Sequence, residues 1–248
     1  MRKHFAAAGV TALEEVSLTI APGEFVSVLG PSGCGKSTLL RCIAGLEVPS
    51  AGSVSVNGTP VTEPPEGLGM VFQRDALLEW RSVMDNLMLP IDFRHGDRAA
   101  AAGHAERLLA LTGLTGFEKR YPAQLSGGMR QRVAICRALV DDPALLLMDE
   151  PFGALDALTR DQMNVELQKM WLAEKKTVVF VTHSITEAIY LGDRVVVFSP
   201  RPGRIADVIE VDLPRPRRLA VRGSEKFLGY ATHIRKLFEA MGLLKEDE

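Results

Sequence analysis

The fold is decided by the stretch Gly30-Pro31-Ser32-Gly33-Cys34-Gly35-Lys36-Ser37-Thr38. It fits the pattern G-x-x-x-x-G-K-[ST] and lies between a predicted buried strand over 24–29 and a predicted helix over 36–44. Glycines in such a turn let backbone N–H groups point inward around a polyphosphate, and the start of the helix adds a favourable dipole. We therefore predict a phosphate-binding loop in which Lys36 reaches the β and γ phosphates and Ser37 can ligate Mg2+.

A second predicted strand ends in two acidic residues. Residues 145–148 are apolar, and Asp149 and Glu150 follow them directly. A phosphate-binding loop needs such carboxylates to hold the metal ion and to activate water. We predict that Asp149 binds Mg2+ and that Glu150 polarises the attacking water. The alternative is an acidic surface turn with no role in catalysis.

Another glycine-rich segment opens a further predicted helix and reads Leu125-Ser126-Gly127-Gly128-Met129-Arg130-Gln131. Ser126 can cap that helix, and Gly127 and Gly128 expose its first N–H groups, which predicts a second anion site. The segment resembles the signature motif of the ATP-binding cassette (ABC) ATPases. That resemblance implies a head-to-tail homodimer, in which one subunit's signature closes on the ATP held by the other's phosphate loop. The signature residues implied to act in trans are Leu125, Ser126, Gly127, Gly128 and Gln131.

Three shorter elements resemble those of the same family and follow in the family's order. Gln73 resembles the glutamine that reaches Mg2+ and the water, Asp156 resembles the D-loop residue at the dimer interface, and His183 resembles the switch histidine. Ser184 stands where many relatives have Asp, and with Glu187 it forms a predicted capping box for the next helix. The resemblance implies Lys36, Gln73, Glu150 and His183 as catalytic residues and Ser37, Gln73 and Asp149 as Mg2+ ligands.

The resemblance also implies the contacts to ATP. These are Phe5 and the loop residues Gly30, Pro31, Ser32, Gly33, Cys34, Gly35, Lys36, Ser37 and Thr38. Phe5 is the candidate for stacking on adenine, because no Tyr, Trp or other Phe precedes Phe25, which we assign to the core. Relatives have a strand before this aromatic, whereas here the chain begins almost at it. We therefore expect that strand to be absent, which is consistent with a truncated or misassigned start.

Strand-like and helix-like segments alternate along the chain, which is typical of a mostly parallel sheet covered by helices. The predicted fold class is α/β: a P-loop NTPase (RecA-like) ABC nucleotide-binding domain with an antiparallel β subdomain and a helical subdomain. Residues 53–56, a hairpin at Asn57-Gly58 and a short strand over 70–72 form a small β region. Further strands are predicted over 144–148, 177–182 and 194–198, and a helix over 158–173.

The predicted ATPase domain covers residues 1–218. Its core lies in 1–73 and 141–218, and its helical subdomain in about 74–140. A helical extension over 219–248 contains a predicted closing helix over 227–241.

Composition excludes several classes of protein. The 248 residues carry 29 Lys and Arg against 31 Asp and Glu, a balance that argues against a dedicated nucleic-acid binder. No apolar run reaches the roughly 18 residues that a membrane-spanning helix needs. Three cysteines at wide spacings predict neither a disulfide framework nor a metal site, and they favour a reducing compartment.

ABC ATPases serve repair, translation and transport. Repair members separate the two halves of the cassette by long coiled coils, and translation members fuse two cassettes, whereas this chain has neither feature. The resemblance therefore implies a transport ATPase on the cytoplasmic face of the inner (plasma) membrane, bound to a separate permease. The permease would dock in a groove lined by residues after Gln73, such as 76–81, and by the helical insertion. The alternative is that Leu77, Leu78 and Trp80 belong to the core, and for Leu77 the two interpretations fit equally well. The alternative class is a soluble phosphate-loop kinase.

The segments 181–188, 193–195 and 200–205 resemble the nitrate/sulfonate/taurine importer branch of the family. This resemblance implies uptake of a small, anionic solute with the help of a periplasmic or lipid-anchored solute-binding protein. A vitamin precursor or an aromatic acid is the alternative cargo.

Overall fold

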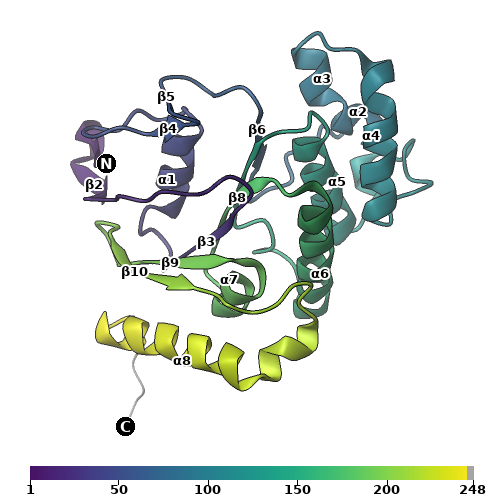
Figure 1. Cartoon of the computed structure of the whole chain (residues 1–248). Helices are drawn as coiled ribbons and strands as arrows, with labels where there is room; N and C mark the ends of the chain where they lie inside the picture. Colours follow the sequence, from purple (N-terminus) through teal and green to yellow (C-terminus); the bar gives the residue numbers. More distant parts are fainter. Residues whose placement is uncertain (245–248) are drawn as a thin grey trace. The chain divides into compact units, whose positions relative to one another are not determined.

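The computed structural model describes residues 1–244, within which the chain forms two compact units (Figure 1). The first unit consists of Met1–Pro65 together with the chain from Thr177 onward, and the second consists of Glu66–Lys176. Each unit contains parallel strands and its own helices. The finer division into a helical subdomain over about 74–140 and an extension over 219–248 stays a prediction.

The first unit is built around strands that run side by side in the order β10-β9-β3-β8. Their bounds are Ile205–Glu210 for β10, Arg194–Phe198 for β9, Phe25–Leu29 for β3 and Thr177–Thr182 for β8. β9, β3 and β8 are parallel and largely buried runs of Val and Phe, as expected of strands covered on both faces. Leu29 pairs with Thr182, so the residues that follow these two strands, Gly30 and His183, leave the sheet at the same end.

Two short antiparallel pairs belong to the same unit. β1 (Lys3–Phe5) pairs with β2 (Val10–Leu13), and β4 (Ser55–Val56) pairs with β5 (Thr59–Pro60). The predicted hairpin is confirmed, because Asn57 and Gly58 have the positive φ angles of 52° and 79° that such a turn requires. The expectation that no strand accompanies Phe5 is wrong, since β1 ends at this residue. A strand of three residues gives no periodic pattern, and only pairing with β2 makes it one.

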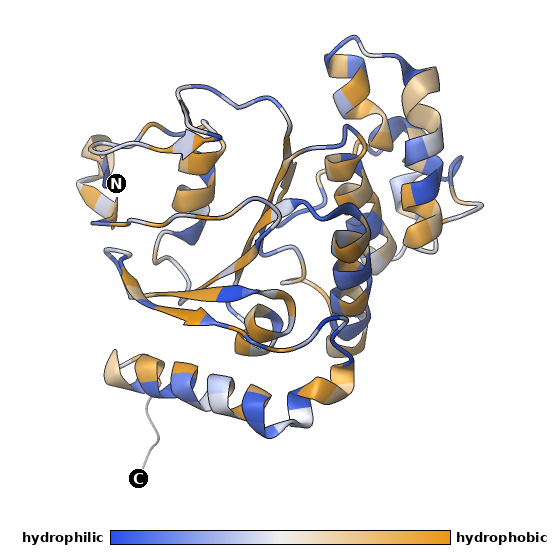
Figure 2. Ribbon diagram, in the orientation of Figure 1, coloured by the Kyte–Doolittle hydropathy of each residue, from blue (hydrophilic) through white to orange (hydrophobic). Residues whose placement is uncertain are grey.

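The helices of the first unit are α1 (Lys36–Ile43), α7 (Ile185–Leu191) and α8 (Glu225–Ala240), with 3-10 turns at Ala6–Ala8 and Leu219–Gly223. Figure 1 shows α8 running alongside β9 and β10, and Figure 2 shows its alternating apolar and polar faces. Its buried residues, Phe227, Ala231, Ile234 and Phe238, recur every three or four positions. The predicted closing helix over 227–241 is thus confirmed to within two residues.

A buried arginine ties the segment before α8 to the end of α7. Arg217 donates hydrogen bonds to the carbonyl groups of Ile189, Tyr190, Gly192, Val211 and Leu213. Burial lowers the pKa of Arg217 to about 10, so the guanidinium stays charged at neutral pH. The last carbonyls of a helix need such donors, so Arg217 caps α7, the helix that follows His183.

The second unit contains the parallel pair β6 (Leu68–Val71) and β7 (Leu145–Asp149). Its helices are α2 (Val83–Leu87), α3 (Leu89–Phe93), α4 (Arg98–Leu111), α5 (Gly127–Leu139) and α6 (Ala157–Glu174), with a 3-10 turn at Pro122–Gln124. Val71 pairs with Met148, so Gln73, which follows β6, and Asp149 and Glu150, at the end of β7, lie at the same end of the two strands.

Two strands depart from the sequence expectation. Residues 70–72 are predicted to belong to the small β region, but β6 pairs in parallel with β7 instead. β10 is not predicted at all, although its residues alternate between half-buried and exposed. Its residue types do not follow this alternation, because Asp207 lies on the half-buried face and Val208 on the exposed face, so the usual strand pattern is missing.

Candidate functional site

The phosphate loop takes the shape that its glycines permit. The chain leaves β3 at Gly30 and enters α1 at Lys36, and in between Gly33 and Gly35 have φ angles of 76° and 107°. L-residues with a side chain rarely adopt these angles. The residue before α1 is Gly35, which has no side chain with which to cap the first turn. The first N–H groups of this helix therefore face the loop, as an anion site requires.

Lys36 lies over this loop and is only 4% exposed. Its Nζ donates to the carbonyl oxygens of Gly30 at 2.9 Å and Pro31 at 3.0 Å. The ammonium group is thus held inside the turn that the sequence predicts to wrap around phosphates. Ser32 and Gly33 are exposed, so solvent reaches the loop, whereas Cys34 is buried. Ser37 and Thr38 are half-buried at the start of α1.

His183 is exposed directly after β8, and the neighbouring backbone is fixed by buried groups. The Thr182 hydroxyl donates to Glu187 Oε2 at 2.5 Å and accepts from the backbone N–H of Ser184 at 3.0 Å. Ser184 Oγ in turn accepts from the N–H of Glu187 at 3.3 Å, the bond expected of the predicted cap. The imidazole is therefore presented from a well-defined turn at the end of the sheet where the phosphate loop begins.

The acidic residues of the second unit lie at the end of β7. Asp149 closes this strand, and Glu150 follows it with a φ of 45°. A residue other than glycine in this left-handed region costs on the order of 1 kcal/mol and is found preferentially at functional sites. Gln73, after β6, is exposed. The amide and the two carboxyl groups therefore extend from neighbouring strand ends.

The signature segment opens α5. Ser126 Oγ accepts from the N–H of Met129 at 3.3 Å, so the predicted cap is confirmed. Gly127 is exposed, whereas Gly128 is buried against α6, where a Cβ would lie 2.8 Å from Thr159 Cγ2. Leu125 is buried. Gln131 is also buried, and its Nε2 has no hydrogen-bond partner among residues 1–244.

Asp156 has a structural task in its own chain. It is the N-cap of α6, and its side chain accepts from the N–H of Thr159 at 3.0 Å. Hydrogen bonds from the Thr159 side chain and backbone lower the pKa of this exposed carboxyl group. The predicted role of Asp156 at a dimer interface stays a prediction.

Phe5 is half-buried at the end of β1. Lys3 Nζ lies 4.8 Å from the centroid of its ring and forms an ion pair with Glu47 at 2.7 Å. One face of the ring is thus covered by a cation. Stacking of Phe5 on adenine stays a prediction.

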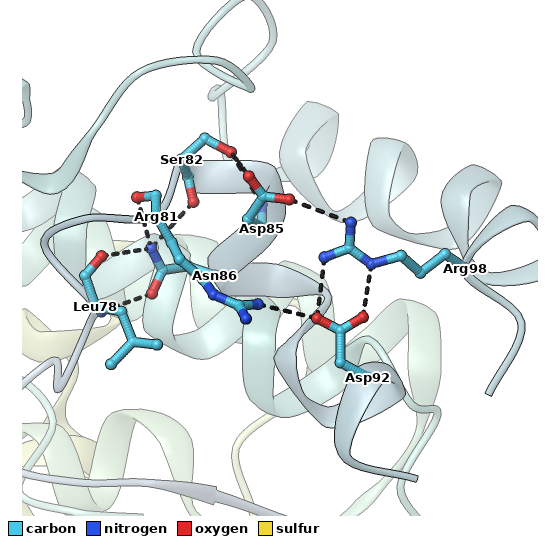
Figure 3. A network of polar contacts seen from close by, with 7 residues as sticks. All are labelled: Leu78, Arg81, Ser82, Asp85, Asn86, Asp92 and Arg98. Carbon is cyan, nitrogen blue, oxygen red and sulfur yellow. Dashed lines mark hydrogen bonds and ion pairs between the residues drawn. The ribbon is translucent and has the colours of Figure 1, made fainter. Parts of the chain in front are cut away.

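The segment after Gln73 is anchored by side chains that the sequence analysis did not single out. Asn86 accepts from the N–H of Leu78 and donates to the carbonyls of Leu78, Arg81 and Ser82. Figure 3 shows this anchor beside the ion pairs of Arg98 with Asp85 and Asp92. Leu77 is buried and therefore a core residue, whereas the Trp80 side chain is 75% exposed.

Two arginines of α5 contact the same segment. Arg130 Nε donates to Asp75 Oδ2 at 3.0 Å, and its other nitrogen donates to the Leu125 carbonyl at 2.9 Å. Arg137 donates to the carbonyls of Asp75 and Ala76, each at 2.7 Å. Arg130 could have been found from the sequence, because it lies within the signature, but nothing in the pattern indicates Asp75 as its partner.

The structure groups the predicted site residues into two sets. The first unit brings the phosphate loop and His183 to one end of its strands, and the second brings Gln73 to the same strand ends as Asp149 and Glu150. Among residues 1–244, no cluster of three or more His, Cys, Asp or Glu could hold a metal ion. Within that same part of the chain, no helix is both long and apolar enough to cross a bilayer.

Comparison with known proteins identifies the family. Residues 13–153 match the sequence profile described as "ABC transporter". The taurine import ATP-binding protein TauB of Rhizobium johnstonii is 48% identical over 93% of this chain and 87% of its own length. The aliphatic sulfonates import ATP-binding protein SsuB of Bacillus cereus is 43% identical over 95% of this chain and 92% of its own length.

Similar solved structures belong to the same family as these sequence relatives. A dimeric structure of MJ0796, titled a bacterial ABC transporter cassette, has a TM-score of 0.73 at 33% identity and covers 86% of this chain and 97% of that chain. A dimeric post-hydrolysis state of the same cassette, bound to ADP and Pi, has a TM-score of 0.72 at 32% identity, with 86% and 96% covered. The predicted P-loop NTPase fold is thereby confirmed. The chain therefore belongs to the ABC transporter family and is an ATPase of the ATP-binding cassette type.

Proposed function

We propose that this chain is the ATP-hydrolysing subunit of an importer that takes up a small, anionic solute such as a sulfonate or taurine through a separate permease. The observation that carries this proposal is the identity of 43–48% to SsuB and TauB over more than nine-tenths of the chain. The alternative cargo is a vitamin precursor or an aromatic acid. The residues of this subunit do not distinguish these solutes, because the solute is not expected to touch it.

In this proposal the phosphate loop binds ATP. Lys36, already buried over the loop, supplies the positive charge for the β and γ phosphates. The inward N–H groups of the loop and of α1 hold the phosphate oxygens. Phe5 contributes the adenine contact. The φ angles of Gly33 and Gly35, which a residue with a side chain would rarely adopt, support this role of the loop.

Glu150 orients the attacking water, and His183 contacts the γ phosphate and the water. The place of Glu150 directly after Asp149, at the strand end that also leads to Gln73, supports this role. The hydroxyl, amide and carboxylate oxygens of Ser37, Gln73 and Asp149 are the donor types that Mg2+ prefers, and they would hold the ion together with the nucleotide. When bound, Mg2+ neutralises charge that develops on the phosphates.

The signature serves a second copy of the chain. Ser126 and Gly127 are exposed at the start of α5, so the N–H groups of this helix are open to a ligand from outside. A head-to-tail homodimer would place them on the γ phosphate of the partner's ATP, with Asp156 near the interface. The dimeric structures of the similar cassette support this arrangement.

The permease would dock on the segment after Gln73. Asn86 holds this segment through four hydrogen bonds. Within the segment Leu77 is buried, whereas Trp80 is largely exposed. An exposed tryptophan on a rigid backbone is typical of a residue that anchors an interface. The subunit would then lie on the cytoplasmic face of the inner membrane, and a periplasmic or lipid-anchored protein would deliver the solute. Nucleic acid is not expected as a partner.

Hydrolysis in the presence of the permease tests the proposal. We expect phosphate to be released from ATP without any phosphorylated acceptor and faster when the permease is added. Glu150→Gln should reduce hydrolysis at least about a hundredfold while ATP still binds. Transfer of phosphate to a small molecule would instead indicate the kinase alternative, and normal hydrolysis by Glu150→Gln would refute the role of this residue.

A further inference from the structure

We propose that Arg201 is a positioning residue for ATP binding, which holds the phosphate loop in shape from outside through a hydrogen bond to the Gly33 carbonyl. Arg201 Nε donates to this oxygen at 3.0 Å. The inference rests on the proposed function, in which residues 30–38 bind ATP. Arg201 lies in the turn 199–204, which connects β9 to β10.

This turn lies directly against the outer side of the phosphate loop. A Cβ on Gly203 would lie 2.0 Å from the Cys34 carbonyl oxygen, closer than any side chain allows. At the end of β9, a Cβ on Gly30 would lie 2.9 Å from Phe198 Cβ. The two backbones therefore touch on both sides of the Arg201 hydrogen bond.

The turn 199–204 is held in place by its own hydrogen bonds and by hydrogen bonds to residues 12 and 14. Ser199 N–H donates to the Arg204 carbonyl at 2.9 Å, and Arg204 N–H donates to Ser199 Oγ at 3.1 Å. Gly203 N–H donates to the Ala12 carbonyl of β2 at 2.9 Å, and the Gly203 carbonyl accepts from Glu14 N–H at 3.0 Å. Arg201 therefore extends from a backbone that is hydrogen-bonded to β2 and does not depend on the phosphate loop alone.

The hydrogen bond acts on the peptide unit that joins Gly33 and Cys34. In a planar trans peptide the carbonyl and the N–H point in opposite directions. The Gly33 carbonyl points out to Arg201, so the Cys34 N–H points to the inner side of the loop, where it donates to the Pro31 carbonyl oxygen at 3.4 Å. Gly33 has a φ of 76°, and because glycine has no side chain its backbone could rotate to other conformations. The hydrogen bond from Arg201 disfavours such rotation and so keeps the loop in the closed turn that the proposed ATP site uses.

Arg201 is exposed, so water competes for the carbonyl and the expected effect is moderate. Removing the donor should raise the Kd for ATP about threefold to tenfold. Because Arg201 contacts the loop that binds ATP and not the residues proposed to act on the water, KM should rise with Kd, and kcat at saturating ATP should stay within about twofold.

Two substitutions of equal length test the hydrogen bond. Arg201→Gln keeps an N–H donor at the position of Nε, whereas Arg201→Met has the same reach without a donor. Arg204→Met is the matched control, because Arg204 lies in the same turn and its side chain forms an exposed ion pair with Glu14. The Kd for ATP is measured by titration calorimetry on the full chain, and Tm is measured alongside.

We expect weaker ATP binding in Arg201→Met, near-normal binding in Arg201→Gln and Arg204→Met, and no change of Tm in any of them. Normal binding by Arg201→Met would overturn the inference. Equal weakening in Arg201→Met and Arg201→Gln would also overturn it, because the positive charge and not the donor would then matter. Lys36→Ala separates this failure from a failure of the proposed function, since unchanged ATP affinity there would refute the phosphate loop itself.

Discussion

The chain contains two glycine-rich helix starts, the phosphate loop before α1 and the signature before α5, and their surroundings differ. A Cβ on Gly35 would lie 2.6 Å from the Ala12 carbonyl oxygen, and Lys36 is buried over the loop. Among residues 1–244, and apart from the backbone of α5 itself, a Cβ on Gly127 would meet nothing closer than a nitrogen of Arg130 at 4.0 Å. Neighbours in the same unit enclose the first turn, whereas the second is open.

This difference indicates which of the two helix starts can bind a nucleotide by itself and which requires a second molecule. The phosphate loop is held by the backbone of β2 and by the turn 199–204 of its own unit. The signature offers exposed N–H groups and one capping hydroxyl, which is too little to hold a nucleotide alone. A ligand carried by another molecule, such as ATP on a second copy of the chain, fits this open helix start.

The largest effect should come from alanine in the enclosed turn. Gly35→Ala places a side chain at a φ of 107° and against the Ala12 carbonyl, so ATP affinity should fall about 30-fold or more. Gly127→Ala should leave the ATP affinity of the monomer unchanged. Calorimetric titration of both variants measures the difference, with circular dichroism as the control for folding. Equal losses in the two variants would contradict the comparison.

This contrast could be predicted from the sequence only in part. The glycine pattern and its place between strand and helix are sufficient to predict the phosphate loop, and Ser126 predicts the cap of α5. The neighbours that enclose the loop come from residues 12 and 198–203, and no local pattern links these to residue 33. The φ angle of Glu150 likewise depends on the backbone around it and has no signature in the sequence.

A smaller effect should come from the one signature glycine that is packed. In Gly128→Ala the new methyl group would lie 2.8 Å from Thr159 Cγ2, which should lower the free energy of unfolding by about 1–2 kcal/mol. Thr159→Ser removes that methyl group and should restore most of the loss in the double variant. Denaturant titration measures both. A loss that Thr159→Ser does not reduce would show that another contact is responsible.

The segment 76–81 of the second unit, which contains the exposed Trp80, should affect the coupling to the permease and not basal hydrolysis. Trp80→Ala should leave basal hydrolysis and Tm unchanged, because the side chain is largely in solvent. Stimulation of hydrolysis by the permease should fall about threefold to tenfold, as expected when an interface anchor is lost. Leu228→Ala, at another exposed apolar residue, in α8 of the first unit, serves as the control. Unchanged stimulation in Trp80→Ala would place the docking surface elsewhere.

The smallest effect concerns the ion pairs of Figure 3. A hydrogen bond from Ser82 lowers the pKa of Asp85, and one from Arg98 lowers the pKa of Asp92. Carboxyl groups with depressed pKa values stabilise the folded state above their unfolded pKa of about 3.8, and this contribution is lost as the pH falls through the folded values.

Arg98→Met should therefore cost about 0.5–1 kcal/mol at pH 7, because these groups are partly exposed, and progressively less as the pH falls below 3.8. Unfolding by urea at pH 7 and at a pH below 3.8 measures the difference. A cost that is equal at both would mean that Arg98 acts through packing of its aliphatic part.

The central claim, that the open signature completes a nucleotide site on a second copy, is tested most directly by sedimentation of the Glu150→Gln chain with Mg-ATP. We predict that the mass doubles on addition of ATP and that a further Ser126→Arg substitution abolishes this doubling without weakening ATP binding to the monomer. A chain that binds ATP but remains monomeric, or a dimer that forms equally well with Ser126→Arg, would contradict the claim.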